Sequence, residues 1–509
     1  MRTLFLSILL TTAAPAFAQS ASLAAAHARI AADYDRTVAE VIELTEIPAP
    51  PFKETARAQR VKEKFTALGL ENVQIDAVGN VIGTRPGKDR AAKALMVAAH
   101  LDTVFPPETP IKVRREGDML HAPGIGDTTV TVAALLAFVR AMDAAKLQTS
   151  RDIIFVANVG EEGQGDLRGV RHLFSASPLK PRIGDFISFD GSTVGRITNS
   201  AVGSRRYRVA FKGPGGHSYG AFGLVNPMVA MADTVSGMYR IPVPTDVKTT
   251  YAASTITGGT SVNSIPNLIT AEFDMRSASP ANLKAVETQF LKLIEDSVVK
   301  ENTARNTRFG KISAVPELIG DRPAGSTPAS DPLVQAASRV LTANGYDATL
   351  TASSTDSNIP ISLGIPAVTL SAGGGGFRAH ALDEYISVER GAFVKGLTTA
   401  FDIGRDQTAI ARAPAAALSF RNATASAART TGPSAPQPWQ CGGQPCAKPG
   451  AVSGFPRPSR TICSWTDSAP PATQCFFARL FGPIPIAGDS FRAASAPLSL
   501  RDVDGFAGL

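Results

Sequence analysis

Blocks of apolar positions alternate with amphipathic blocks from about residue 28 to residue 410. The runs "KALMVAAH", "DIIFVANV" and "DFISFD" are almost continuously apolar, which is typical of strands buried on both faces of a parallel sheet. Between such runs, apolar residues recur every three or four positions, which predicts helices over 28–45, over 54–68 and in "TVTVAALLAFVRAM". Buried strands separated by helices predict an α/β fold, with a parallel-core sheet flanked by helices.

The pattern changes near residue 202. "RRYRVAFKG" alternates between apolar and polar residues, and a helix-like "NPMVAMADTVSGM" follows. Two further strand-like runs, "TTYAASTITGG" and "NLITAEFDMRS", precede a predicted helix at about 281–299. This order predicts an α+β sandwich inserted into the larger domain. The α/β pattern resumes after about residue 322 with "DPLVQAASRVLTANG" and "IPAVTLSAGGGG".

The N-terminal sequence "MRTLFLSILLTTAAPAFAQS" has the features of a secretory signal. Arg2 precedes an apolar stretch, and the small-residue pattern Ala16-Phe17-Ala18 predicts cleavage after Ala18. The apolar stretch is too short to span a membrane, and no later run is long enough to suggest a span. We therefore expect an exported protein, periplasmic or secreted, without a membrane partner.

Chain length and net charge indicate how many domains the protein has and which partners it binds. A chain of 509 residues with 44% apolar content has room for about three domains with real cores. The formal net charge is +7, but residues 411–509 hold nine Arg and Lys against four Asp, a net of +5, which leaves +2 for the rest. The preceding body is nearly neutral and has no basic stripe, so we expect no nucleic-acid partner.

Residues 411–509 differ in composition from the rest of the chain. They are rich in Ala, Pro, Ser and Arg without a sustained period, and we interpret them as a low-complexity, disordered tail. A disulfide-stapled module, a zinc knuckle or a fused extension are alternatives, although the cysteine spacing lacks the paired CxxC pattern of structural zinc sites. The tail holds all the cysteines of the chain, Cys441, Cys446, Cys463 and Cys475.

These patterns predict the organisation of the chain. It comprises a signal peptide at 1–18, an α/β domain in two parts at 19–201 and 319–410, an inserted α+β domain at 202–318, and the tail at 411–509.

Potential metal ligands stand where predicted strands end. His100 closes "ALMVAAH", the pair Glu161 and Glu162 follows "DIIFVANV", and Asp190 closes "FISFD". Open α/β sheets bind ligands at the carboxyl ends of their strands, so we expect these side chains to converge on one edge. The full set of candidate groups is His100, Asp102, Asp127, Glu161, Glu162, Asp190 and His380.

Imidazole and carboxylate groups without a thiol favour borderline divalent cations, zinc first, with cobalt or manganese as alternatives. One histidine and one carboxylate per ion, joined by a shared aspartate, would hold two divalent metal ions and leave a coordination position open. An open position is typical of catalytic sites. Such a site lowers the pKa of a water molecule, which can then attack a carbonyl group.

The adjacent glutamates can serve one site only if the chain turns, because neighbouring side chains of a strand point to opposite faces. Gly160 and Gly163 provide that turn. As a hypothesis, Glu162 binds metal while Glu161 is the general base that passes the water's proton to the leaving amine. Asp102, two residues after the histidine that ends its strand, is placed to orient the imidazole ring.

The motifs "HLDT", "GIGD", "GEEG", "FDG" and a late "AH" followed by an acid four residues on resemble a known family in order and spacing. This is the di-zinc peptidase family of peptidase T, carboxypeptidase G, succinyl-diaminopimelate desuccinylase and aminoacylases, and the resemblance spans roughly residues 35–405. It implies that Asp127 bridges two ions and that Glu161 is the base. The implied ligands are His100, Asp127, Glu162, Asp190 and His380.

The resemblance also assigns residues of the inserted sandwich, which matches the family's lid and frequent dimer interface. His217 in "GPGGHSYG" resembles the lid histidine that stabilises the developing oxyanion, sometimes from the partner subunit. Asn263 and Arg276 resemble residues that hold the substrate's carboxylate, although an arginine in an alternating strand is usually a solvated residue. The chain departs from the family after Asp127, where Thr128 replaces the usual acid or lysine.

Other groups have ordinary explanations. Asp356 and Glu384 fit positions behind the ligands, but turn chemistry and a helix start explain them equally well. His27, His121 and His172 are interpreted as structural. "SAGGGG" is not part of a phosphate-binding motif.

The sequence thus predicts an exported metallohydrolase that cleaves amide or peptide bonds of small substrates, most simply an exopeptidase acting on short peptides. An N-acyl-amino-acid amidohydrolase would use the same site. A non-catalytic peptide-binding or metal-binding protein is an alternative of another class, although such a carrier has no use for the carboxylate of Glu161. A homodimer through the lid is also expected.

Overall fold

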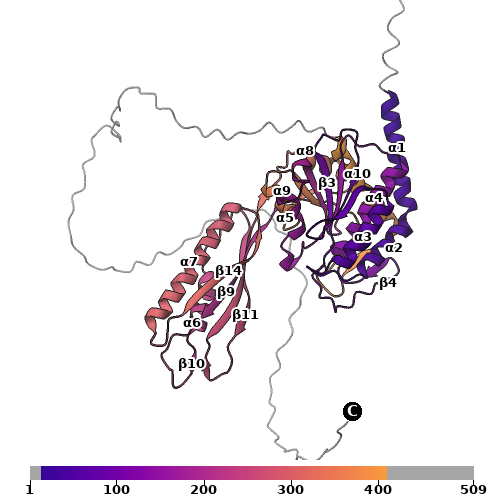
Figure 1. Cartoon of the computed structure of the whole chain (residues 1–509). Helices are drawn as coiled ribbons and strands as arrows, with labels where there is room; N and C mark the ends of the chain where they lie inside the picture. The colour runs from indigo at the N-terminus through magenta and orange to yellow at the C-terminus, as the bar shows by residue number, and fades with distance from the viewer. Residues whose placement is uncertain (1–12, 410–509) are drawn as a thin grey trace, which may run out of the picture. The chain divides into compact units, whose positions relative to one another are not determined.

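The computed structural model describes residues 13–409, and side chains from 21 to 407. Figure 1 colours the described chain from indigo to orange. The tail at 411–509 and most of the apolar part of the expected signal lie outside the described residues, so both interpretations stay predictions.

A nine-stranded mixed sheet forms the centre of the α/β part, in the order β1-β2-β6-β3-β7-β17-β8-β15, with β16 paired to β8. The central strands β6, β3, β7 and β17 are mutually parallel, as the apolar runs predicted. Strands β1, β2 and β8 flank this core in antiparallel pairs. The strands are β1 Glu71–Ile75, β2 Val81–Arg85, β3 Ala94–His100, β6 Ile153–Asn158, β7 Ile183–Phe189, β8 Arg196–Ala201, β15 Gly325–Ser326, β16 Thr349–Ser353 and β17 Ala367–Leu370.

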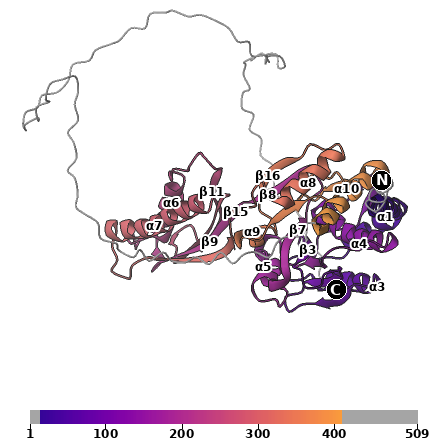
Figure 2. The same ribbon diagram turned by 90° about the horizontal axis from the view of Figure 1, so that it is seen from above.

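Helices cover both faces of this sheet (Figure 2), which explains why its central strands are apolar throughout. In β3, Leu95 and Val97 pack with α1, α2, α3, α4, α8 and α10, whereas Met96 and Ala98 face α5 and α9. Successive strand residues point to opposite faces, so each face has its own core. The helices are α1 Ala13–Ala32, α2 Tyr34–Thr45, α3 Thr55–Ala67, α4 Val130–Ala144, α5 Arg168–Ser175, α8 Pro332–Ala343, α9 Asn358–Ser362 and α10 Arg390–Ala409.

The helix predicted over 28–45 is interrupted at Asp33, between α1 and α2. Asp33 is buried, and its Oδ2 accepts hydrogen bonds from Arg29 Nε at 3.0 Å and from Arg140 Nε on α4 at 2.7 Å. This tertiary contact fixes the bend, which helical periodicity alone does not reveal.

Helix α4 and the turn before it are the most apolar helical segment. By length and composition, Ile125–Ala144 is long enough to cross a membrane, but 94% of its most apolar 18-residue window is buried inside the protein. It is therefore explained as a core helix that packs on the central sheet.

The inserted lid has a separate four-stranded antiparallel sheet in the order β11-β13-β9-β14. Helices α6 and α7 share one hydrophobic core with this sheet. Each begins with a capping residue and a proline: Asn226 accepts from the backbone N–H of Met228, and Ser279 from that of Asn282. The elements are β9 Gly203–Lys212, α6 Pro227–Met238, β11 Thr249–Gly258, β13 Leu268–Ser277, α7 Pro280–Ala304 and β14 Ser313–Arg322.

The chain enters the lid sheet through β9 and leaves it through the adjacent strand β14. Ser204 pairs with Arg322 where both strands meet the α/β part. Strand β14 therefore extends four residues beyond the expected lid boundary at 318, and its last residue, Arg322, reaches the α/β part.

Candidate metal centre

His100 ends β3 and is almost fully buried. Its Nε2 lies 3.0 Å from Asp127 Oδ1 and 3.6 Å from Asp190 Oδ1. Asp127 stands in the turn before α4, and Asp190 directly follows β7. Residues from three separate segments thus meet at the carboxyl end of the parallel core, as the strand-end argument predicted.

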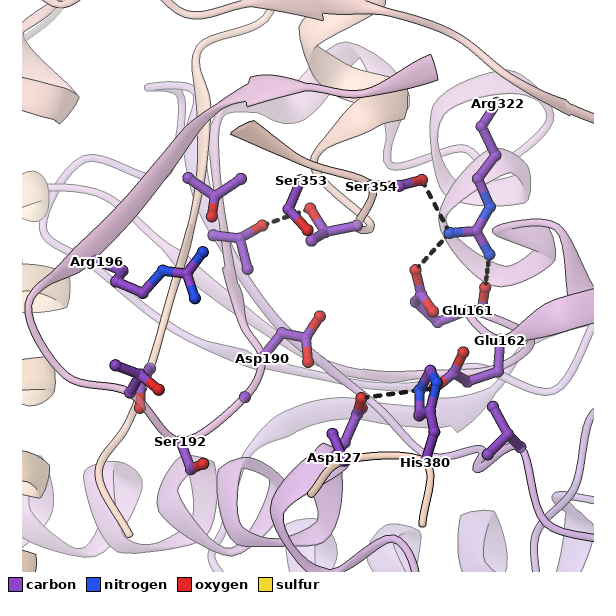
Figure 3. A pocket seen from close by; sticks show the side chains of 18 of the residues that line it. Asp127, Glu161, Glu162, Asp190, Ser192, Arg196, Arg322, Ser353, Ser354 and His380 are labelled. Atoms are coloured by element: carbon purple, nitrogen blue, oxygen red, sulfur yellow. Dashed lines mark hydrogen bonds and ion pairs between the residues drawn. The ribbon is translucent and has the colours of Figure 1, made fainter. Parts of the chain in front are cut away.

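A second histidine–carboxylate group, His380 and Glu162, lies beside Asp127 (Figure 3). His380 Nε2 is 2.8 Å from Glu162 Oε1 and 3.2 Å from Asp127 Oδ2. The two oxygens of Asp127 therefore face different histidines, one each. One ligand atom from each of His100, Asp127 and Glu162 lies within 4.8 Å of the others, a spacing suited to a metal ion.

These contacts shift pKa values in opposite directions. Burial lowers the pKa of His100, but the nearby carboxylates of Asp102, Asp127 and Asp190 outweigh this effect and raise the pKa well above its usual range. Hydrogen bonds to Asp127 and Glu162 raise the pKa of His380 to about 10. Burial alone would raise the pKa of Asp127, but its bonds to both histidines hold it below the usual range. Without metal, the imidazoles are the positive partners of these carboxylates.

The donor set fits a pair of divalent cations. Carboxylates outnumber cationic side chains in this partly buried cluster, so added positive charge would relieve repulsion and desolvation. His100, Asp190 and Asp127 Oδ1 would hold one ion. His380, Glu162 and Asp127 Oδ2 would hold the other.

Two buried acids hold the loops that carry these ligands. The carboxylate of Asp102 accepts the backbone N–H groups of Glu161 at 3.0 Å and Glu162 at 2.8 Å. The Nδ1 of His100 lies 3.0 Å from the backbone carbonyl oxygen of Asp102, closer than the 3.7 Å to its carboxylate. Asp102 therefore contacts the ring mainly through its main chain, and its carboxylate fixes the glutamate turn.

Glu384 has a corresponding role on the other side. Its carboxylate accepts backbone N–H groups from Gly124 at 2.9 Å, Gly126 at 2.7 Å and Asp127 at 2.9 Å. Burial raises the pKa of Glu384 to about 7. Because the carboxylate of Glu384 bonds to the main chain around Asp127, we interpret Glu384 as a support of this turn rather than as a simple helix start. The hydroxyl of Thr128, which follows Asp127, forms a hydrogen bond with the hydroxyl of Thr131 at 2.6 Å.

The turn expected between the adjacent glutamates is present. Gly160 and Gly163 have φ values of 66° and 50°, in the left-handed region that glycine adopts readily. Glu162 faces His380, whereas Glu161 faces Arg322 (Figure 3). The two carboxylates therefore lie at the same edge with different partners.

Arg322 is a functional candidate that the sequence did not reveal. It is buried, and its Nη1 donates to Glu161 Oε1 at 3.0 Å and to Ser354 Oγ at 3.2 Å. Its Nη2 donates to the backbone oxygen of Glu161. Burial raises the pKa of Glu161 well above its usual range, and the charge of Arg322 opposes this shift. A single arginine before a proline gave no sequence signal for this contact.

A cavity of about 580 Å³ opens beside the centre. Arg276, on β13, lines it, and its Nε donates to Asp274 Oδ2 at 2.6 Å. His217 and Asn263 are not among the described residues that line the cavity. They lie together on a ribbon of β10 (Gly216–His217) and β12 (Ser264–Ile265), where Ser218 N–H donates to Asn263 O at 2.8 Å.

Residues 96–401, more than half of the chain, match the profile described as peptidase family M20/M25/M40. The chain belongs to this peptidase family. This match confirms the resemblance drawn from the motifs. As a member of this family, the protein is a hydrolase of the metallopeptidase and amidohydrolase type. Among curated protein sequences, none matches this chain significantly.

Solved structures of this family share the fold. An aminopeptidase PepT from Bacillus cereus is 22% identical, with 73% of this chain and 99% of that chain covered at a TM-score of 0.59. A tripeptidase from Staphylococcus aureus gives 21% identity, 74% and 99% coverage and a TM-score of 0.62. The Bacillus subtilis YxeP protein, described as a dinuclear metal binding peptidase, is 15% identical, with 74% of this chain and 99% of that chain covered at a TM-score of 0.56. The predicted fold class is confirmed.

Proposed function

We propose that the protein is an exported exopeptidase that hydrolyses short peptides. It would use two divalent cations, with zinc as the preferred metal. One observation carries the proposal: Asp127 lies between two histidine–carboxylate pairs, and Glu161 stands beside them in the same cavity. The expected signal sequence supports export. Peptidases and a tripeptidase among the neighbours favour a small peptide over a polymer.

The cations, when bound by His100, Asp127, Asp190, Glu162 and His380, would supply Lewis-acid activation of a water molecule and of the substrate carbonyl. The chain's own contribution is to fix the ligands from behind. Asp102 and Glu384 hold the two ligand-bearing loops through five backbone N–H bonds, and this preorganisation limits rearrangement during the reaction.

Glu161 is the proposed general base. Arg322 bonds to Oε1 of its carboxylate, and in the described part of the chain Oε2 accepts no hydrogen bond. This oxygen can take the proton of the attacking water and deliver it to the leaving amine. Arg322 fixes the carboxylate's orientation, while Asp102 fixes the main chain that carries it.

The lid residues enter the proposal as substrate groups. Arg276 lines the cavity and is placed to bind a substrate carboxylate through its guanidinium fork. His217 and Asn263 would contribute when the lid closes or from a partner subunit, with His217 at the developing oxyanion. A homodimer through the lid would permit the latter arrangement.

A panel of dipeptides, tripeptides and N-acyl amino acids, incubated with and without Zn²⁺, Co²⁺ or Mn²⁺, tests the activity and separates exopeptidase from amidohydrolase. Glu161→Gln should lower kcat by about 100-fold or more while the bound metal stays constant. Glu295→Gln changes an exposed glutamate on α7 and is the matched control. Metal-independent turnover, or unchanged kcat in Glu161→Gln, would contradict the mechanism.

A further inference from the structure

The cavity contains one cationic side chain without a partner in the described part of the chain. Arg206 and Arg276 both bond to Asp274, Arg322 bonds to Glu161, and His380 bonds to Glu162. The side chain of Arg196 makes no hydrogen bond or ion pair among the side chains and main-chain groups that the structure describes. The other positive groups already have acidic partners, so Arg196 is the guanidinium most available to a ligand.

Strand geometry explains why Arg196 faces the cavity. It is the first residue of β8, and Thr198, two positions later, lies on the same face and also lines the cavity. Ser353, at the end of the neighbouring β16, adds a hydroxyl to this wall. In Figure 3, Arg196 and Ser192 lie on the other side of Asp190 from Arg322. The guanidinium of Arg196 is therefore separate from the Glu161–Arg322 pair.

The wall around Arg196 is polar. Hydroxyl groups of Ser192, Thr193, Thr198 and Ser353 line it, whereas large apolar side chains are represented in the cavity by Val104 and Leu370 alone among the described residues. An apolar substrate side chain would remove water from the guanidinium without giving it a partner, which is costly. A carboxylate would form charge-assisted hydrogen bonds with the guanidinium and accept others from the hydroxyls.

We propose that Arg196 binds an acidic side chain of the substrate, so that peptides with Asp or Glu beside the scissile bond are preferred. The proposal rests on the proposed peptidase function and adds its substrate class. Arg196 is distinct from Arg276, which is assigned to the substrate's main-chain carboxylate. An acidic dipeptide would then engage one arginine from β8 and another from β13.

Matched peptides test this assignment. The probes are Ala-Glu against Ala-Gln and Glu-Ala against Gln-Ala, pairs that differ in charge but hardly in size. We expect the acidic member of at least one pair to have a kcat/KM about 10-fold or more above its neutral partner, the usual worth of a hydrogen bond to a charged group. Arg196→Gln should bring this ratio close to one, and Arg196→Glu should invert it. Arg339→Gln, an exposed arginine on α8, is the control and should keep the ratio.

The possible results distinguish failure of the Arg196 assignment from failure of the proposed peptidase function. Hydrolysis of peptides without acidic preference, or an acidic preference that survives Arg196→Gln, overturns the role of Arg196 and leaves the peptidase function intact. An equal loss on acidic and neutral peptides would assign Arg196 to the terminal carboxylate and also overturn the proposal. If no peptide is hydrolysed, the proposed function fails. Calorimetric binding of Ala-Glu and Ala-Gln to zinc-loaded protein and to its Arg196→Gln variant then decides the acidic subsite by the same ratio.

Discussion

Replacing Arg322 by methionine would test the buried ion pair that holds Glu161. Methionine keeps much of the side-chain volume but removes the charge and all donors. The variant loses the bond to Glu161 Oε1 at 3.0 Å, the bond to Ser354 Oγ at 3.2 Å, and the bond to the backbone oxygen of Glu161. Both charged side chains are almost fully buried, at 5% and 6% exposure, so water cannot readily replace the lost partner.

Coulomb's law at 3.0 Å with an effective dielectric of about 20 gives about 5.5 kcal/mol for the pair. Removing one partner of a buried pair typically costs about 3–5 kcal/mol. Burial already raises the pKa of Glu161, so the orphaned carboxyl can take up a proton and limit the loss. We therefore expect a cost of about 3 kcal/mol in the free energy of unfolding of the metal-free protein.

The sign of the pH dependence follows from the same shift. A carboxyl whose pKa is higher in the folded state keeps its proton over a pH range in which the unfolded chain has lost it, so stability falls as pH rises through that range. Removing Arg322 raises the pKa of Glu161 further. The cost of Arg322→Met should therefore be smaller at pH 5 than at pH 8.

Urea unfolding in the presence of a chelator measures these costs in the wild type, in Arg322→Met, in Glu161→Gln and in the double variant. We expect the double variant to be more stable than the sum of the single effects implies, by about 2 kcal/mol, because no charge is then left unpaired. A cost of Arg322→Met below about 1 kcal/mol, or additive effects in the double variant, would refute this account of the pair.

Three further predictions concern the metal ligands and their supports. Removal of the metal by a chelator should abolish hydrolysis. The Asp127→Ala variant should bind less of both metal ions, as measured by mass spectrometry, and loss of one ion alone would contradict the bridging role of Asp127. Binding of Zn²⁺ at pH 7 should release protons, because the raised pKa values keep His100 and His380 protonated without metal, and affinity should rise with pH. Calorimetry in buffers of different ionisation enthalpy measures this release, and a buffer-independent heat would exclude it. Asp102→Asn can accept only one of the two glutamate N–H groups well and should cost about 2–4 kcal/mol by urea unfolding, whereas an unchanged midpoint would remove its carboxylate from the support of that turn.

The sequence predicted the elements with strong apolar patterns. Strands β3, β6 and β17 are buried along their whole length and β7 at all but one position, so their apolar runs are unambiguous. Strands β1 and β16 have mixed exposure and little periodicity, so their contribution to the sheet depends on tertiary pairing. Helix boundaries such as the bend at Asp33 depend on buried contacts from distant residues.

The site shows the same division. The expected ligands His100, Glu162 and Asp190 could be placed together because parallel strands end at one edge, and the structure brings them together. Arg322 and Arg196 could not be selected, because an arginine at the end of a strand is usually an ordinary surface residue. Arg322 is instead buried, and Arg196 is exposed but lines the cavity. Their positions depend on how β14 and β8 meet the sheet edge, which no local pattern records.

The adjacent placement of β9 and β14 has a consequence for how this architecture tolerates change. The chain enters and leaves the inserted domain through two strands that pair at Ser204 and Arg322, so the domain is joined to the α/β part at one place. The length or sequence of the insertion can therefore change without altering the order of strands in the α/β sheet. A domain exchange that shifted the pairing of β9 and β14 by one residue would turn Arg322 away from Glu161. Replacing the lid could therefore remove the partner of the proposed general base.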